Sequence, residues 1–126
     1  MQPAKQTLLI ASVFGFVAVA VGAFGAHALK PLLVAANRVE TYELASRYLF
    51  YHTFALLSIG IWQFHNQTPT LAVAVKFFCA GILLFSGSLF VLALTGKTWL
   101  GMITPLGGVA LLAGWATLGL AAFRKE

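Results

Sequence analysis

The chain has 126 residues, of which 60% are hydrophobic and only 9% are charged, where a soluble globular domain has about a quarter charged. Eight Lys and Arg with three Asp and Glu cannot solvate a globular surface of this size, and the mean hydropathy of +0.91 places most side chains against lipid or against each other. The composition therefore excludes an ordinary soluble domain and predicts a membrane protein in a lipid bilayer. The basic residues are scattered, which excludes a nucleic-acid-binding stripe and is typical of helix ends at a membrane surface.

Four apolar runs follow one another along the chain, each near the length of about 20 residues that a helix needs to cross the hydrocarbon. They cover residues 7–26, 48–64, 71–94 and 104–123. We expect an all-α membrane protein in which residues 1–126 form one domain, a compact bundle of four transmembrane helices. The first run is longer than the core of a cleaved signal peptide, about 7 to 15 residues, so we expect it to remain as an anchor.

The connection before the second run contains a helix-start signal. Asn37, followed three residues later by Glu40, resembles a capping box and predicts a helix over residues 38–64. Such a helix is longer than the second run, so its first turns would extend the span as an interfacial segment. Glu43 and Arg47 are spaced i, i+4 within that segment, in the favourable order for an ion pair on a helix.

The third and fourth runs also have boundary residues. Thr68 precedes Pro69 and Thr104 precedes Pro105, and in each pair the hydroxyl can cap a helix while the proline takes the first helical position. Gly96 is placed to end the third helix. The balance of Lys and Arg does not decide the orientation, because equal numbers fall on the two sides of a four-span arrangement.

Small residues recur along one face in three of the four runs, at spacings of three, four or seven. Such seams let transmembrane helices approach closely, which replaces the hydrophobic drive available in water. They predict helix–helix interfaces and leave some seams for self-association, but the spacing does not say which seam meets which. The seams are Ala11, Gly15, Ala18, Gly22 and Gly25 in the first run, Ala74, Gly81, Ser88 and Thr95 in the third, and Gly107, Ala110, Gly114, Thr117 and Ala121 in the fourth.

Few polar groups lie inside or beside the apolar runs, and most of them fall toward the pole opposite the chain ends. Burying such groups in hydrocarbon is expensive unless they are paired, so each is a candidate for structure or function. We expect a candidate polar site at this pole, formed by His27, Arg47, Tyr51, His52, Ser86, Ser88 and Thr104.

His52 is the strongest candidate, because an ionisable residue within a span is a functional hypothesis by default. Its ring could hold helices in register, relay a proton, or bind a metal or haem iron, with His27 as a second imidazole. No CxxCH or HExxH motif and no third clustered carboxylate accompanies them, and Cys79 is the only cysteine. We therefore expect no catalytic residues, no metal and no cofactor. Trp115 lies deep in the fourth run, where its indole N–H needs a partner.

Several segments taken together resemble a known family. Residues 22–30 (GAFGAHALK), 48–56, 85–89 (FSGSL) and 103–108 (ITPLGG), with Gly114-Trp115, resemble in the same order the small multi-pass membrane proteins that include YgdD and YwdK. The resemblance covers nearly the whole chain and implies a multi-pass protein of the bacterial inner membrane. That family has no known function, so the resemblance implies no activity and no catalytic roles.

Two functions remain open. The small size, the many seams and the lack of a catalytic set favour a non-enzymatic accessory or scaffold component, acting as a homo-oligomer or in a larger membrane complex. His52 and Arg47 favour the alternative, an oligomeric relay or transport protein for protons or a small solute.

Overall fold

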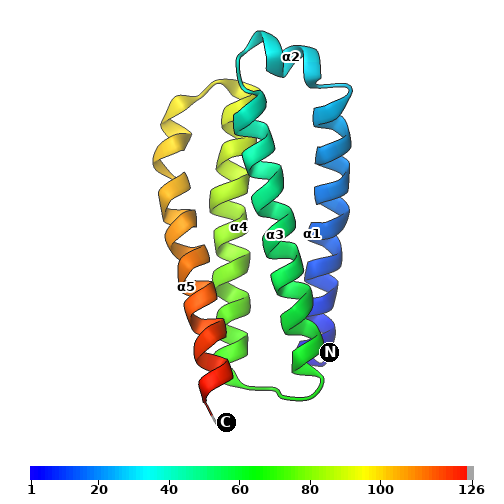
Figure 1. Ribbon diagram of the computed structural model, residues 1–126, viewed down its shortest axis with the longest axis vertical. Coiled ribbons are helices and arrows are strands. Elements are labelled where there is room, and N and C mark those ends of the chain that lie inside the picture. Colours follow the sequence, from blue (N-terminus) through cyan, green and yellow to red (C-terminus); the bar gives the residue numbers. More distant parts are fainter. Residues whose placement is uncertain (125–126) are drawn as a thin grey trace.

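The computed structural model describes residues 1–124, which are helical with short connections. Four long helices, α1, α3, α4 and α5, lie side by side along the long axis of the molecule, and α1 begins at the end where α5 stops (Figure 1). Two short helices, α2 and η1, lie at the opposite end. The elements are α1 (Pro3–Ala26), α2 (Lys30–Ala35), α3 (Val39–Gln63), α4 (Pro69–Thr95), the 3₁₀ helix η1 (Thr98–Met102) and α5 (Thr104–Phe123).

Within the described residues, three segments are long and apolar enough to cross a membrane. They are Pro3–Ala26 and Pro69–Thr95, each with a mean hydropathy of 2.4, and Thr98–Phe123, with 1.8. The expected all-α class is confirmed, and these segments make the chain a multi-pass membrane protein. α3 has a similar length, 25 residues, but its charged first turns and His52 make it too polar to be identified as a span by composition.

The four long helices form a layer in the order α1, α3, α4, α5 (Figure 1). α4 packs against α5 on one side and α3 on the other, and α3 packs in turn against α1. α1 and α5 form the two edges and make no comparable contact with each other, so the bundle is open between them. Most of the core therefore lies along α3 and α4, where Leu56, Ile59, Leu71 and Phe78 are fully buried.

The small-residue seam of α5 faces α4, and Gly81 of the α4 seam faces Leu111 of α5. A methyl group added at Gly107 would lie 2.7 Å from the Cα of Phe85, and one added at Gly114 would lie 2.8 Å from the ring of Phe78. Glycine therefore lets the α5 backbone approach α4 more closely than any larger residue would allow. The seam of α1 instead faces α3, where Gly15 lies against Thr53 and Gly25 against Tyr42, and Ala11 and Ala18 are buried.

The predicted capping box before α3 is wrong. Arg38 is the N-cap of α3 and makes no side-chain cap hydrogen bond, while Asn37 has a φ of 55°. The backbone N–H groups of Arg38 and Asn37 donate to Leu33 O and Val34 O, at 2.8 and 3.1 Å. This is the Schellman pattern, in which a left-handed residue ends a helix. Asn37 thus terminates α2, a helix that the sequence analysis did not predict.

The other boundaries are close to expectation with one exception. Thr68 caps α4 by accepting a hydrogen bond from the Leu71 N–H at 3.2 Å, and Gly96 ends α4 with a φ of 72°, as predicted. α1 begins at Pro3, four residues before the first apolar run. The predicted cap at Thr104 is wrong, because Thr104 is the first residue of α5 and its hydroxyl bonds to another helix.

Candidate functional site

The His52 ring lies in the middle of the layer with both of its nitrogens hydrogen-bonded. Nδ1 is 2.7 Å from the carbonyl oxygen of Tyr48, and the indole Nε1–H of Trp115 donates to Nε2 at 3.1 Å. A carbonyl can only accept and an indole can only donate, so these contacts require the neutral ring with its proton on Nδ1. Only 4% of His52 is exposed. Neither ring nitrogen is open to a ligand in this arrangement.

Aromatic side chains from three helices enclose this histidine. The ring centroid of Tyr48 lies 5.7 Å from that of His52 in a stacked arrangement, that of Phe78 lies 5.7 Å away, and that of Trp115 lies 5.9 Å away, edge to face. Phe85 of α4 stacks on Tyr48 with the centroids 4.6 Å apart. α3 and α5 are separated in the layer by α4, so the His52–Trp115 hydrogen bond joins them across the face of α4.

The two serines and Thr104 join helices as well. Ser86 Oγ of α4 donates to the carbonyl oxygen of Ala45 in α3 at 2.8 Å. Ser88 Oγ lies 2.6 Å from Thr104 Oγ1, which connects α4 to the first turn of α5. Each hydroxyl is thereby hydrogen-bonded to a neighbouring helix and not to water.

Tyr42 makes a further contact of this kind. Its hydroxyl donates to the carbonyl oxygen of Val21 in α1 at 2.5 Å. The ring lies against Gly25, where a side chain would collide with it, and meets Phe90 edge to face with the centroids 5.0 Å apart. Burial raises the pKa of the Tyr42 phenol above its ordinary value of 10.0. The phenol is therefore a neutral hydrogen-bond donor at neutral pH.

The remaining predicted site residues lie at the surface. Arg47 forms an ion pair with Glu43 at 4.0 Å, and both side chains are 54% exposed. Tyr51 is 55% exposed. His27 is exposed at the C-cap of α1 and is not one of the partners of His52. The structure therefore does not gather the seven predicted residues into one pocket.

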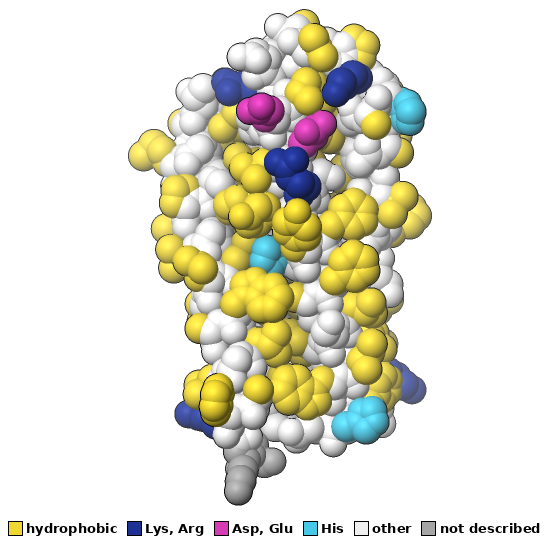
Figure 2. Space-filling view, in the orientation of Figure 1, with side chains coloured by type: hydrophobic (Ala, Val, Ile, Leu, Met, Phe, Trp, Pro, Cys, Tyr) yellow, Lys and Arg dark blue, Asp and Glu magenta, His cyan; other side chains and the backbone are white. Residues whose placement is uncertain are grey.

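Two hollows meet at Tyr51 on one face of the layer. The larger, about 560 Å³, runs between α3 and α5 and is lined by Tyr48, Tyr51, His52, Gly108, Leu111, Leu112 and Trp115. We call it the α3–α5 groove. The second, about 370 Å³, is lined by Glu43, Ser46, Arg47, Phe50 and Tyr51, and we call it the charged hollow. Figure 2 shows acidic and basic side chains at the upper end of this face and hydrophobic side chains below them. Within residues 1–124, no group of three or more His, Cys, Asp or Glu side chains is arranged to hold a metal ion.

Comparisons with known proteins agree on one family. The family described as "Protein of unknown function (DUF423)" matches residues 21–108. The UPF0382 membrane protein SSP2132 of Staphylococcus saprophyticus is 38% identical over 120 residues, which cover 95% of this chain and 98% of that protein. The UPF0382 inner membrane protein YgdD of Escherichia coli K12 is 36% identical over 119 residues, covering 94% and 90%. A UPF0382 membrane protein of Haemophilus influenzae is 33% identical over 122 residues, covering 97% of each chain. No solved structure matches significantly.

Proposed function

We propose, for a chain that belongs to the DUF423 family of membrane proteins of unknown function, a non-enzymatic role as an accessory or scaffold component of the bacterial inner membrane. The membership confirms the resemblance drawn from the sequence. The proposal concerns what such a protein does there: it holds transmembrane helices in a fixed arrangement, as a homo-oligomer or as a subunit of a larger complex.

We further propose that α3 is a fourth membrane span. α1 and α4 run in the same direction along the layer, and α3 returns between them in the opposite direction (Figure 1). If α1 and α4 both cross the bilayer, the chain must cross it once more between them. The span would cover residues 48–64, and the first turns of α3, which contain Glu40, Glu43 and Arg47, would form the interfacial extension.

The observation that carries the scaffold proposal is the use of the polar side chains in and beside the spans. Four hydrogen bonds each join a different pair of helices. A relay or a catalytic site needs a donor or acceptor that is open to its substrate, whereas groups fixed to each other hold helices in register. The pairs are α1–α3 through Tyr42 and Val21, α3–α4 through Ala45 and Ser86, α4–α5 through Ser88 and Thr104, and α3–α5 through His52 and Trp115.

The alternative, a relay for protons or a small solute, depends on His52. To pass a proton, Nε2 would have to release the indole of Trp115 and then bind that proton. The geometry supports this less well, because the hydrogen bond that must break also joins α3 to α5.

The test is purification in nanodiscs followed by native mass spectrometry, with flux measured on the same protein in liposomes. The scaffold proposal expects a homo-oligomer or a stoichiometric partner, and no flux of protons above that of empty liposomes. Proton flux that stops in His52→Ala but not in the matched variant His65→Ala, in a monomer or an oligomer, would overturn it in favour of the relay. His65 lies in the turn after α3, which makes it a suitable control.

A further inference from the structure

We propose that the α3–α5 groove and the charged hollow together form a binding site for one phospholipid with a primary ammonium headgroup, of the phosphatidylethanolamine type. The groove would receive an acyl chain and the charged hollow would receive the headgroup. This proposal is independent of the scaffold function.

The order of chemical groups along α3 carries the argument. Glu43, Arg47 and Tyr51 follow at intervals of one turn, about 6 Å each, and the apolar groove begins at Tyr51. Acid, base and apolar surface thus succeed each other from the pole toward the middle of the layer. An aminophospholipid has the complementary order, with its ammonium outermost, its phosphate next and its acyl chains deepest.

Arg47 has the capacity to bind the phosphate. A guanidinium has five N–H donors, and the single contact with Glu43 is at the outer limit for an ion pair, 4.0 Å, between two half-exposed side chains. Arg47 can therefore bind a phosphate through two donors while Glu43 accepts from the ammonium. Ser46 and Tyr51 line the same hollow and add hydroxyl groups. An anionic headgroup with no ammonium would instead meet the carboxylate of Glu43 unpaired.

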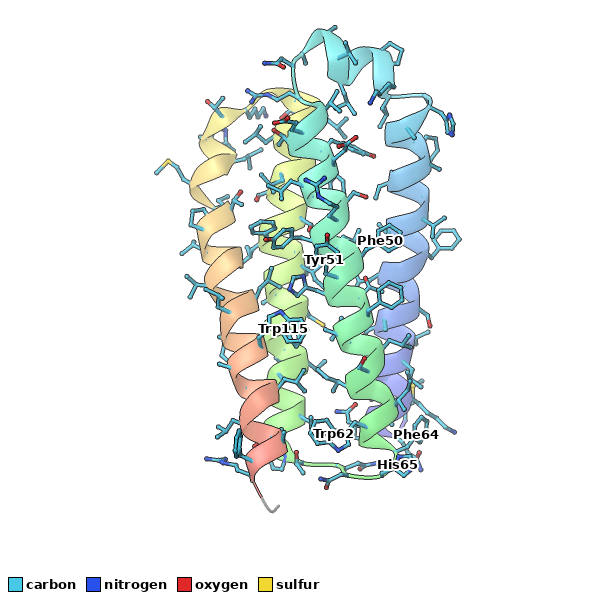
Figure 3. The ribbon with its side chains drawn as sticks, in the orientation of Figure 1. Phe50, Tyr51, Trp62, Phe64, His65 and Trp115 are labelled. Atoms are coloured by element: carbon cyan, nitrogen blue, oxygen red, sulfur yellow. The ribbon has the colours of Figure 1, made fainter. Side chains whose placement is uncertain are left out.

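The groove has the form that an acyl chain requires. Its wall on α5 spans Gly108 to Trp115, about 10 Å along the helix, and its volume of about 560 Å³ lies within the usual range for small-molecule sites. Gly108 has no side chain to fill the groove, and the nearest atom that a methyl group there would meet is 3.8 Å away, in the ring of Phe85. Figure 3 shows Tyr51 above Trp115 on the same face, between α3 and α5.

The experiment measures which lipid the protein retains. The full chain is placed in nanodiscs with equal parts of phosphatidylethanolamine, phosphatidylcholine and phosphatidylglycerol of identical acyl chains, then released for native mass spectrometry. We expect one phosphatidylethanolamine per chain, preferred about two- to fivefold over phosphatidylglycerol, the range expected for one exposed ion pair. It should also be preferred over phosphatidylcholine, whose quaternary ammonium has no N–H to donate to Glu43. Glu43→Gln should abolish the preference over phosphatidylglycerol, and Arg47→Gln should reduce the retention of all three lipids about fivefold.

Matched variants separate the site from general surface charge. Glu40→Gln and Arg38→Gln remove the same charges near the start of α3, outside both hollows, and should retain lipid as the native protein does. Gly108→Leu should displace the acyl chain, whereas Gly119→Leu, where an added methyl group meets nothing within 4 Å, should not. Equal effects of Glu43→Gln and Glu40→Gln, retention without headgroup preference, or a protein dimer that Gly108→Leu dissociates would each overturn the proposal. The two charge variants are exposed, so the test does not depend on Gly108→Leu folding.

Discussion

Replacing Trp115 by phenylalanine tests whether the His52–Trp115 hydrogen bond fixes α5 to α3. The substitution retains an aromatic ring and removes the Nε1–H that donates to His52 Nε2 at 3.1 Å. The lone pair of Nε2 is then left without a donor on a ring that is only 4% exposed.

The size of the effect follows from the lost hydrogen bond and from the buried acceptor that is left without a donor. A hydrogen bond between transmembrane helices contributes about 0.6 kcal/mol on average and up to about 1.7. A buried acceptor left without a partner costs about 1–3 kcal/mol. Trp115 is 47% exposed, so only part of the indole area lost in the substitution was buried. We expect Trp115→Phe to lower the free energy of unfolding by ~1–2 kcal/mol.

The assay is equilibrium unfolding in mixed micelles with increasing SDS, followed by far-ultraviolet circular dichroism so that loss of a tryptophan does not change the probe. Trp99→Phe is the matched control, because Trp99 lies on η1, is 58% exposed, and should change stability by less than about 0.5 kcal/mol. A double-mutant cycle with His52→Phe isolates the pair. If Trp115→Phe is as destabilising with Phe at position 52 as with His, the hydrogen bond does not stabilise the fold and the reasoning is refuted.

Three further predictions concern the packing of the helices. Gly107→Ala should destabilise by about 1–3 kcal/mol, because its methyl group meets the α4 backbone, while Gly119→Ala should be neutral or slightly stabilising; equal unfolding midpoints would contradict this. Ser86→Ala should cost about 0.6–1.7 kcal/mol by breaking the contact with α3, and Ser58→Ala, whose hydroxyl bonds within its own helix, should cost less in the same assay. The pKa of Tyr42 is raised in the folded state, so its contribution to the free energy of unfolding is fully present below pH 10.0 and is lost as the pH rises through the folded pKa. Unfolding measured from pH 8 upward should show that Tyr42→Phe removes this alkaline loss of stability. The same dependence of stability on pH in Tyr42→Phe and the native protein would contradict the prediction.

The sequence predicts where the helices of this fold lie along the chain better than it predicts which helices pack against each other. Small-residue spacing identified the contact faces of α1, α4 and α5, because only small residues let two backbones approach. It could not pair the faces, since the match of Gly107 with the backbone at Phe85 depends on the position of α5 along α4. The capping box failed because Asn37 adopts the left-handed conformation and ends the preceding helix.

In the candidate site, too, the sequence identified individual residues but not which of them lie in contact. The sequence indicated separately that His52 and Trp115 each needed a polar partner, but it did not pair them. At about 1.5 Å per residue, His52 lies about 16 Å and Trp115 about 12 Å from the helix ends nearest the chain termini, so a count of depth places them at similar levels once the ends of α3 and α5 are known. No count of this kind could indicate that Tyr42 reaches the Val21 carbonyl, because the bond depends on the open space at Gly25.

The order of helices in the layer has a consequence for biosynthesis. Each long helix from α3 onward packs against the long helix that precedes it in the chain, α3 on α1, α4 on α3 and α5 on α4. Folding therefore does not have to wait for the two ends of the chain to meet, and each long helix that follows in the chain already has its docking surface in place. We expect two fragments divided between Gln63 and Pro69 to insert independently and to reassemble along the α3–α4 contact when they are expressed together.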